Sequence, residues 1–148
     1  MTLKTHIYLS FNGQCEEAFK VYERVLGGKI ESLFRWGGSP MEADAPPGFA
    51  DKVMHASLAV GGTLVAGADV PPDRYERPQG FNILLGPDAA ADAERIFEAL
   101  ADGGTVTVPL AQTFWAVRYG AVTDRFGIPW AINCEQAAPD HISAVGTE

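Results

Sequence analysis

The chain repeats one order of elements at an offset of 76 residues, and this repeat limits the possible folds more than any other feature. Gly27-Gly28 ends a helical pattern and precedes a strand pattern, and Gly103-Gly104 stands in the same context 76 residues later. At that offset, the strand predicted over 6–11 matches 82–87, and the helix predicted over 15–27 matches 91–103. Two copies of a β-α-β-β-β unit therefore account for nearly the whole chain. Such paired units usually build one shared cavity.

Hydrophobic periodicity supports the first copy. Residues 6–11 alternate Ile7, Leu9 and Phe11 on one face with His6, Tyr8 and Ser10 on the other, as expected for a strand. A helical stripe follows at Ala18, Val21, Tyr22, Val25 and Leu26. Further strands are predicted over 29–36, 53–60 and 63–69, with a hairpin turn at Gly61-Gly62.

The second copy shows the same order. A strand is predicted at 81–85, and further strands over 105–112, 115–122 and 128–134. Its helical stripe consists of Ala89, Ala93, Ile96, Phe97 and Leu100. We therefore predict a single domain with module one at 3–70, a linker at 71–80, module two at 81–135, and a disordered tail at 136–148.

Composition excludes several classes of protein. The chain has 148 residues, of which 47% are hydrophobic, and a net charge of -8. An acidic chain without a basic cluster argues against nucleic-acid and anionic-membrane partners. No apolar run is long enough for a membrane helix. Two cysteines and no secretory leader predict a cytoplasmic protein without a disulfide framework.

One segment shows neither the helical nor the strand pattern of hydrophobic residues. Residues 37–52 combine three prolines and three glycines with Glu42, Asp44 and Asp51. This composition predicts a surface loop, and its position between two strands suggests a lid over the cavity.

Several separated strings resemble the PhnB-like branch of the vicinal oxygen chelate superfamily, which includes glyoxalases, extradiol dioxygenases and bleomycin-resistance proteins. The strings, in order, are Tyr8-Leu9-Ser10-Phe11-Asn12-Gly13, Cys15-Glu16-Glu17-Ala18, Pro78-Gln79-Gly80-Phe81, Thr113-Phe114-Trp115 and Thr123-Asp124-Arg125-Phe126-Gly127-Ile128-Pro129-Trp130. The resemblance covers about 3–135. It implies an α+β fold in which two β-α-β-β-β modules form a curled mixed sheet around a central cavity, with the helices outside. It also implies a homodimer.

The resemblance does not supply a reaction, since one fold carries many functions. Some members of this branch have been labelled ubiquinone methyltransferases. The chain shows no strand, Gly-rich turn and helix of the kind that holds S-adenosylmethionine, so we do not expect that activity.

Metal-dependent members of the superfamily place four ligands on the first and last strand of each module. Carried onto this chain, these positions fall on His6, Ala66, Asn82 and Ala131. Alanine has no donor atom, and one imidazole with one amide binds a divalent ion poorly. We therefore predict no cofactor and no metal site of the glyoxalase type. A displaced set of His6, His55 and Asp69 is the remaining alternative for a divalent metal ion.

Other candidate residues could each have either a functional role or a purely structural one. His55 is either a general base or a buried histidine bonded to a backbone carbonyl. Arg118 is either a clamp for an anionic ligand or a partner in a salt bridge. Cys15 stands near a helix start, where the dipole lowers a thiol pKa, but no histidine is positioned near it in the sequence, so we do not expect nucleophilic catalysis. Asp69 and Asp124 are more typical of residues that fix a turn than of catalytic groups.

Two functions stay open at this point, beside a purely structural or regulatory dimer with a filled cavity. The first is a metal-independent protein that binds a small molecule, with a predicted cavity lined by His6, Tyr8, His55, Asn82, Trp115 and Arg118. The second is a lyase, isomerase or dioxygenase that uses a divalent metal ion. No motif in the sequence identifies the ligand or a catalysed reaction.

Overall fold

The computed structural model describes residues 1–135 and shows an α+β fold with two units of the same design. The units divide between Arg77 and Pro78, inside the segment predicted as a linker. The predicted disordered tail, 136–148, lies outside the described residues. Each unit has one four-stranded mixed sheet and one long helix, so the predicted pair of β-α-β-β-β modules is confirmed.

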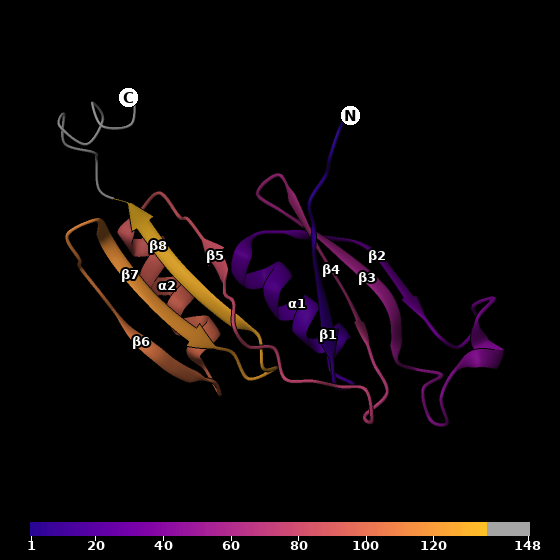
Figure 1. Cartoon of the computed structure of the whole chain (residues 1–148). Coiled ribbons are helices and arrows are strands. Elements are labelled where there is room, and N and C mark those ends of the chain that lie inside the picture. Colours follow the sequence, from indigo (N-terminus) through magenta and orange to yellow (C-terminus); the bar gives the residue numbers. More distant parts are fainter. Residues whose placement is uncertain (136–148) are drawn as a thin grey trace. The chain divides into compact units, whose positions relative to one another are not determined.

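The first unit contains β1 (Ile7–Phe11), α1 (Cys15–Leu26), β2 (Lys29–Arg35), β3 (Val53–Val60) and β4 (Thr63–Asp69). Its strands are ordered β1-β4-β3-β2, with β1 parallel to β4 and the other pairs antiparallel. The helix α1 lies across one face of this sheet (Figure 1). A short 3-10 helix, η1 (Glu42–Asp44), interrupts the loop predicted at 37–52.

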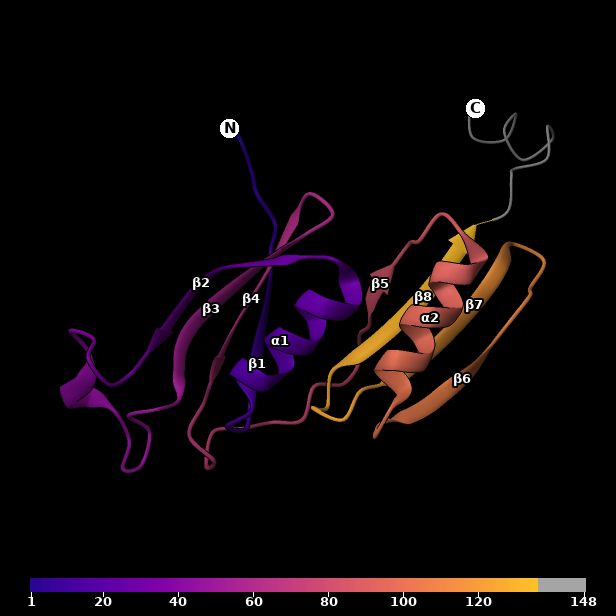
Figure 2. The same ribbon diagram turned by 180° about the vertical axis from the view of Figure 1, so that it is seen from behind.

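The second unit contains β5 (Ile83–Leu85), α2 (Ala90–Ala101), β6 (Thr105–Ala111), β7 (Ala116–Thr123) and β8 (Pro129–Glu135). The strand order β5-β8-β7-β6 and the directions of the pairs repeat those of the first unit. Seen from behind, α2 again covers one face of its sheet (Figure 2). The predicted element bounds agree with the observed bounds within one or two residues.

Apolar burial on the helix side forms the core of each unit. In α1 the predicted stripe is buried except for Leu26, and Phe19 is buried as well. Phe19 packs edge-on against Phe11 of β1, with ring centroids 5.9 Å apart. In α2 the buried residues are Ala93, Ile96 and Leu100. Among the described residues, no helix is long and apolar enough to cross a membrane.

The carboxylate of Asp69 ties the first unit together at the start of α1. Its two oxygens accept hydrogen bonds from the backbone N–H groups of Cys15 and Val53, each at 2.9 Å, and the side chain is buried. One bond satisfies a donor at the helix N-terminus that has no partner within the helix, where negative charge is also favoured. Asp69 therefore fixes the position of α1, which agrees with its predicted structural role.

The environment of Cys15 is not that of a reactive thiol. Its side chain is fully buried. Burial, followed by the nearby carboxylates of Asp69 and Glu16, raises the pKa of the Cys15 thiol far above its ordinary value. The helix dipole acts in the opposite direction, but it is outweighed by the loss of hydration and by the two negative charges.

The buried carboxylate of Asp124 organises the turn between β7 and β8. Its Oδ1 accepts hydrogen bonds from the backbone N–H groups of Phe126 and Ile128, at 2.9 and 3.0 Å. Its Oδ2 accepts from the indole N–H of Trp130 at 2.8 Å. The prediction that Asp124 sets the turn is confirmed.

Replacing Asp124 with alanine is expected to destabilise the protein by about 3 kcal/mol or more, because three buried donors lose their acceptor. Urea unfolding measures the change, and the exposed Asp73→Ala is the matched control. Asp73→Ala should stay within about 0.5 kcal/mol of the parent chain. Equal losses in the two variants would show that the Asp124 network contributes no special stability.

The raised pKa of Cys15 predicts a loss of stability in alkali. Only the unfolded chain can ionise this thiol near its ordinary pKa of about 8.5, so the free energy of unfolding falls as pH rises above that value. The slope due to Cys15 is at most about 1.4 kcal/mol per pH unit. Urea unfolding from pH 7 to 10.5 should show a shallower decline for Cys15→Ala than for the parent. Parallel declines would contradict this assignment.

Candidate functional site

Each sheet has one face that its helix does not cover, which we call the open face. A Cβ placed on Gly67 would lie 3.1 Å from Phe19 of α1, so Gly67 faces the helix. A Cβ on Gly120 would lie 2.7 Å from Phe97 of α2. Because successive strand residues point to opposite faces, the neighbours of these glycines, Ala66 and Ala121, belong to the open faces.

One row of residues crosses the open face of the first sheet. Tyr8 pairs with Ala66, Ala66 with Ser57, and Ser57 with Ser32. We call Tyr8, Ala66, Ser57 and Ser32 row one. Its two central members, Ala66 and Ser57, are small and buried, whereas Tyr8 on the edge strand β1 is 58% exposed. The row therefore has a low centre beside a raised aromatic edge.

His55 extends this polar face. It pairs with Phe34 of β2, and its Nδ1 lies 3.4 Å from the hydroxyl of Tyr8. The two rings are 5.8 Å apart between centroids. Partial burial, with a smaller effect of Cys15, raises the pKa of Tyr8 above its ordinary value, so the phenol is protonated at neutral pH. His55 is half-buried, and its ring nitrogen lies near the hydroxyl of Tyr8. The structural role predicted for a buried His55 has a backbone carbonyl as its partner, and the observed partner is different.

The corresponding row of the second sheet has no polar member. Leu84 pairs with Ala131, Ala131 with Ala121, and Ala121 with Val108. We call these four residues row two. Ala131 and Ala121 are buried, while Leu84 on the edge strand β5 is 63% exposed. Row two thus repeats the low centre and raised edge of row one with apolar side chains alone.

Trp115 and Asn133 add an aromatic and a polar group to the second unit. The indole N–H of Trp115 donates to Oδ1 of Asn133 at 3.1 Å. Trp115 also stacks edge-on with Phe114 and Tyr119, with centroids 4.9 and 5.4 Å away. Asn133 follows Ala131 by two residues on β8, which places it on the same open face.

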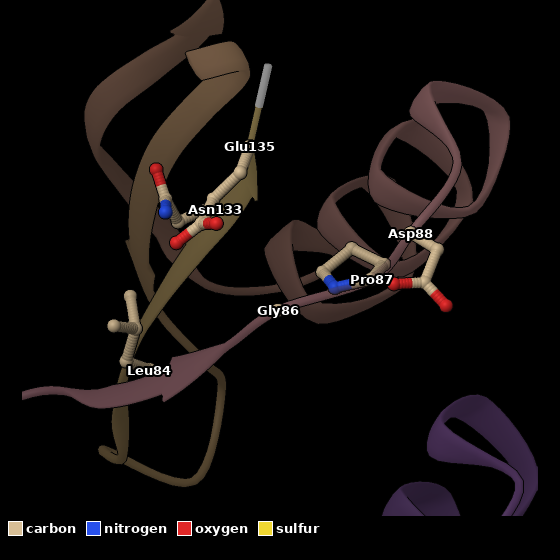
Figure 3. Close-up of a pocket in the computed structure, with 6 residues that line it drawn as sticks. All are labelled: Leu84, Gly86, Pro87, Asp88, Asn133 and Glu135. Atoms are coloured by element: carbon tan, nitrogen blue, oxygen red, sulfur yellow. The ribbon is translucent and has the colours of Figure 1, made fainter. Parts of the chain in front are cut away.

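A pocket of about 340 Å³ lies beside Asn133. Figure 3 shows that its walls come from the end of β8 and from the segment that joins β5 to α2. The lining residues are Leu84, Gly86, Pro87, Asp88, Asn133 and Glu135. The pocket therefore continues from the raised edge of row two and combines apolar side chains with amide and carboxylate groups.

The predicted cavity residues fall into four groups. Tyr8 and His55 lie together in the first unit, and Trp115 lies on the second. His6 and Asn82 are exposed and immediately precede β1 and β5. Arg118 does not join Trp115: it bonds Glu94 of α2 through Nε at 3.0 Å, on the helix side. The salt-bridge alternative for Arg118 is the one observed.

The strand pairing leaves the positions assigned to metal ligands without a complete donor set. Ala66 pairs with Tyr8 and Ala131 pairs with Leu84, while His6 and Asn82 stand two residues before these partners. One imidazole, one amide and two alanines do not form a divalent-metal site, so the residues at these positions do not fit the ion that the superfamily resemblance implies.

The displaced ligand set also fails to come together. Asp69 is buried beside the start of α1 and uses both oxygens for backbone N–H groups, whereas His55 lies on the open face. Within 1–135 no three His, Cys, Asp or Glu side chains gather in an arrangement that could hold a metal ion.

Sequence reasoning missed Ser32 and Asn133. The hydroxyls of Ser32 and Ser57 are 2.7 Å apart, but a register shift between Ile30 and Ser32 hides this pairing from the sequence. Asn133 could have been predicted, because it follows Ala131 by two residues and so points to the same face of the strand.

Comparison with known proteins gives consistent results. The family model described as Glyoxalase/Bleomycin resistance protein/Dioxygenase superfamily matches residues 5–132. Protein YjdN of Escherichia coli K12 is 33% identical over 140 residues, which span 89% of this chain and 95% of YjdN. The crystal structure of PA1353 from Pseudomonas aeruginosa is 46% identical with a TM-score of 0.83, over 92% of this chain and all of that one.

A more distant structure shares the fold. It is described as a putative 3-demethylubiquinone-9 3-methyltransferase, PhnB protein, from Bacillus cereus, and it is 21% identical with a TM-score of 0.77, over 89% of this chain and 99% of that one. The duplicated β-α-β-β-β units, the family match over 5–132 and the 33% identity to YjdN agree: the chain belongs to the glyoxalase/bleomycin resistance protein/dioxygenase superfamily.

Proposed function

We propose that this protein binds a small, partly apolar organic molecule on the open faces of its sheets, without a metal ion. The observation that carries the proposal is the shape shared by row one and row two. In each row, small buried residues occupy the central strands, and a large exposed side chain stands on the edge strand. A low centre beside a raised edge admits a flat ligand.

Exposed apolar groups support this proposal energetically. Leu84, Trp115 and Val108 of the second unit are 63%, 45% and 42% exposed. Leu84 and Val108 stand at the two ends of row two, where a bound ligand would cover apolar side chains. A ligand that removes about 100 Å² of such surface from water gains roughly 2.5 kcal/mol. Members of the superfamily bind small molecules, which agrees with this assignment.

Metal independence is supported by donor chemistry. The positions that the resemblance assigns to metal ligands hold His6, Ala66, Asn82 and Ala131, which offer one imidazole and one amide among them. The metal-enzyme alternative requires His6, His55 and Asp69 to converge, and Asp69 is committed to two backbone N–H groups. Binding therefore accounts for the residues better than metal-assisted catalysis does.

Homodimerisation and a cytoplasmic location stay predictions from the sequence. The large exposed apolar side chains on edge strands favour a partner surface, since isolated monomers rarely leave such groups together in water. Light scattering of the untagged protein measures the oligomeric state directly.

Filling the centres of the rows is expected to block binding. Ala131→Leu and Ala66→Leu each place a larger side chain on an open face, and affinity for a bound small molecule should fall at least about tenfold, or 1.4 kcal/mol. Ligands are found by screening fragments against the full chain with tryptophan fluorescence and calorimetry.

The matched control for this test is Ala91→Leu, which makes the same substitution at an exposed position of α2. It should bind as the parent chain does. A common affinity for all three leucine variants would show that the ligand does not contact the open faces.

Metal titration tests the second part of the proposal. We expect untagged protein to contain less than about 0.1 equivalents of metal, and calorimetry with zinc, nickel, manganese and iron(II) to show no micromolar site, because the donor set is too poor. Tight stoichiometric uptake that is lost in His55→Ala would reject metal independence and favour the enzyme.

A further inference from the structure

Row one and row two occupy equivalent places in the two units but differ in chemistry. Tyr8, Ser57 and Ser32 of row one carry hydroxyl groups, whereas row two consists of Leu84, Ala131, Ala121 and Val108. We propose that the open face of the first sheet is a subsite for an uncharged group that both donates and accepts hydrogen bonds, such as an alcohol or a primary amide. This inference rests on the proposed function.

The pair formed by Tyr8 and His55 presents both kinds of hydrogen-bonding group. If Tyr8 donates to Nδ1 of His55, the free Nε2 carries a proton and donates, while the phenol oxygen accepts. If Nδ1 donates to Tyr8, the phenol O–H donates outward, and Nε2 accepts. In either tautomer of the neutral imidazole, one donor and one acceptor remain for a ligand.

The serine pair behaves in the same way. The hydroxyls of Ser32 and Ser57 share one hydrogen bond at 2.7 Å, so one O–H group and several lone pairs remain. Ser57 is almost fully buried in the centre of the row, while Ser32 is half-buried on the edge strand. A ligand group placed over the low centre meets hydroxyls on β3 and β2.

The lack of charge in the subsite selects a neutral group. Neither row one nor the pair His55 and Phe34 contains a Lys, Arg, Asp or Glu. Lys29 pairs with Ala59, one row further along the same face. Placing an ion on a partly buried surface without a counter-charge costs free energy, whereas an alcohol or amide exchanges hydrogen bonds with water for bonds to the protein.

Aromatic side chains provide the apolar part of the subsite. Tyr8 on β1 and Phe34 on β2 are 58% and 55% exposed, and they stand on the two edge strands on either side of the small central residues. A ring attached to the polar group would contact one of them, because the two edge strands lie about 14 Å apart. The subsite therefore fits a compact molecule with one apolar ring and one uncharged polar head.

The test uses five probes with the same ring: benzyl alcohol, benzamide, toluene, benzoate and benzylammonium. Each is titrated into the full 15N-labelled chain, and amide shifts are followed separately in β1 and β3 and in β5 and β8. We expect benzyl alcohol and benzamide to shift β1 and β3 at concentrations at least about fivefold lower than toluene or the two ions. Toluene should shift β5 and β8.

Ser57→Ala is the diagnostic variant, because it gives row one the residue that row two has at Ala121. It should weaken benzyl alcohol binding at β1 and β3 about fivefold, equivalent to about 1 kcal/mol for one hydrogen bond. Toluene binding at β5 and β8 should not change. The reciprocal variant, Ala121→Ser, leaves row one intact and should bind benzyl alcohol at β1 and β3 as the parent does.

Different outcomes reject different claims. If benzoate or benzylammonium binds β1 and β3 as tightly as benzyl alcohol, or if Ser57→Ala has no effect, the neutral subsite is wrong and the binding function stands. If toluene shifts β5 and β8 but no oxygen-bearing probe shifts β1 and β3, the subsite is likewise wrong. If no probe shifts either open face, both the subsite and the proposed function fail.

Discussion

Packing one helix against one face of a four-stranded sheet determines the rest of each unit. The helix α1 buries Phe19 and Tyr22 against its sheet, and α2 buries Ile96 and Leu100. Because strand residues alternate between faces, this packing commits every second residue to the core and leaves the others on the open face. The candidate site thus consists of the residues that the hydrophobic core does not use.

Two buried aspartates stabilise the two units at different places. Asp69 joins the start of α1 to β3, and Asp124 closes the turn between β7 and β8. Each carboxylate accepts several backbone or indole N–H bonds, so neither is available to bind a metal ion or a substrate. Residues that looked chemically capable in the sequence are therefore part of the scaffold.

Duplication preserved the architecture and allowed the chemistry of the open faces to diverge. The centres of both rows are small, which keeps their shape alike, while hydroxyl groups occur in row one alone. Shape is set by side-chain volume, and hydrogen bonding is set by single atoms on those side chains. One atom can change without loss of the fold, so two copies of one module can recognise different chemical groups.

The number, order and approximate bounds of the elements could be predicted from the sequence, since hydrophobic period and glycine position are local properties. The sequence also identified Tyr8, His55 and Trp115 as candidates, through their residue types and strand parity. Only the tertiary structure placed Tyr8 opposite Ala66, joined Ser32 to Ser57, and paired Arg118 with Glu94. These contacts depend on register between distant strands and on the helix that packs beside them, and a shift of one residue reverses the face of a side chain.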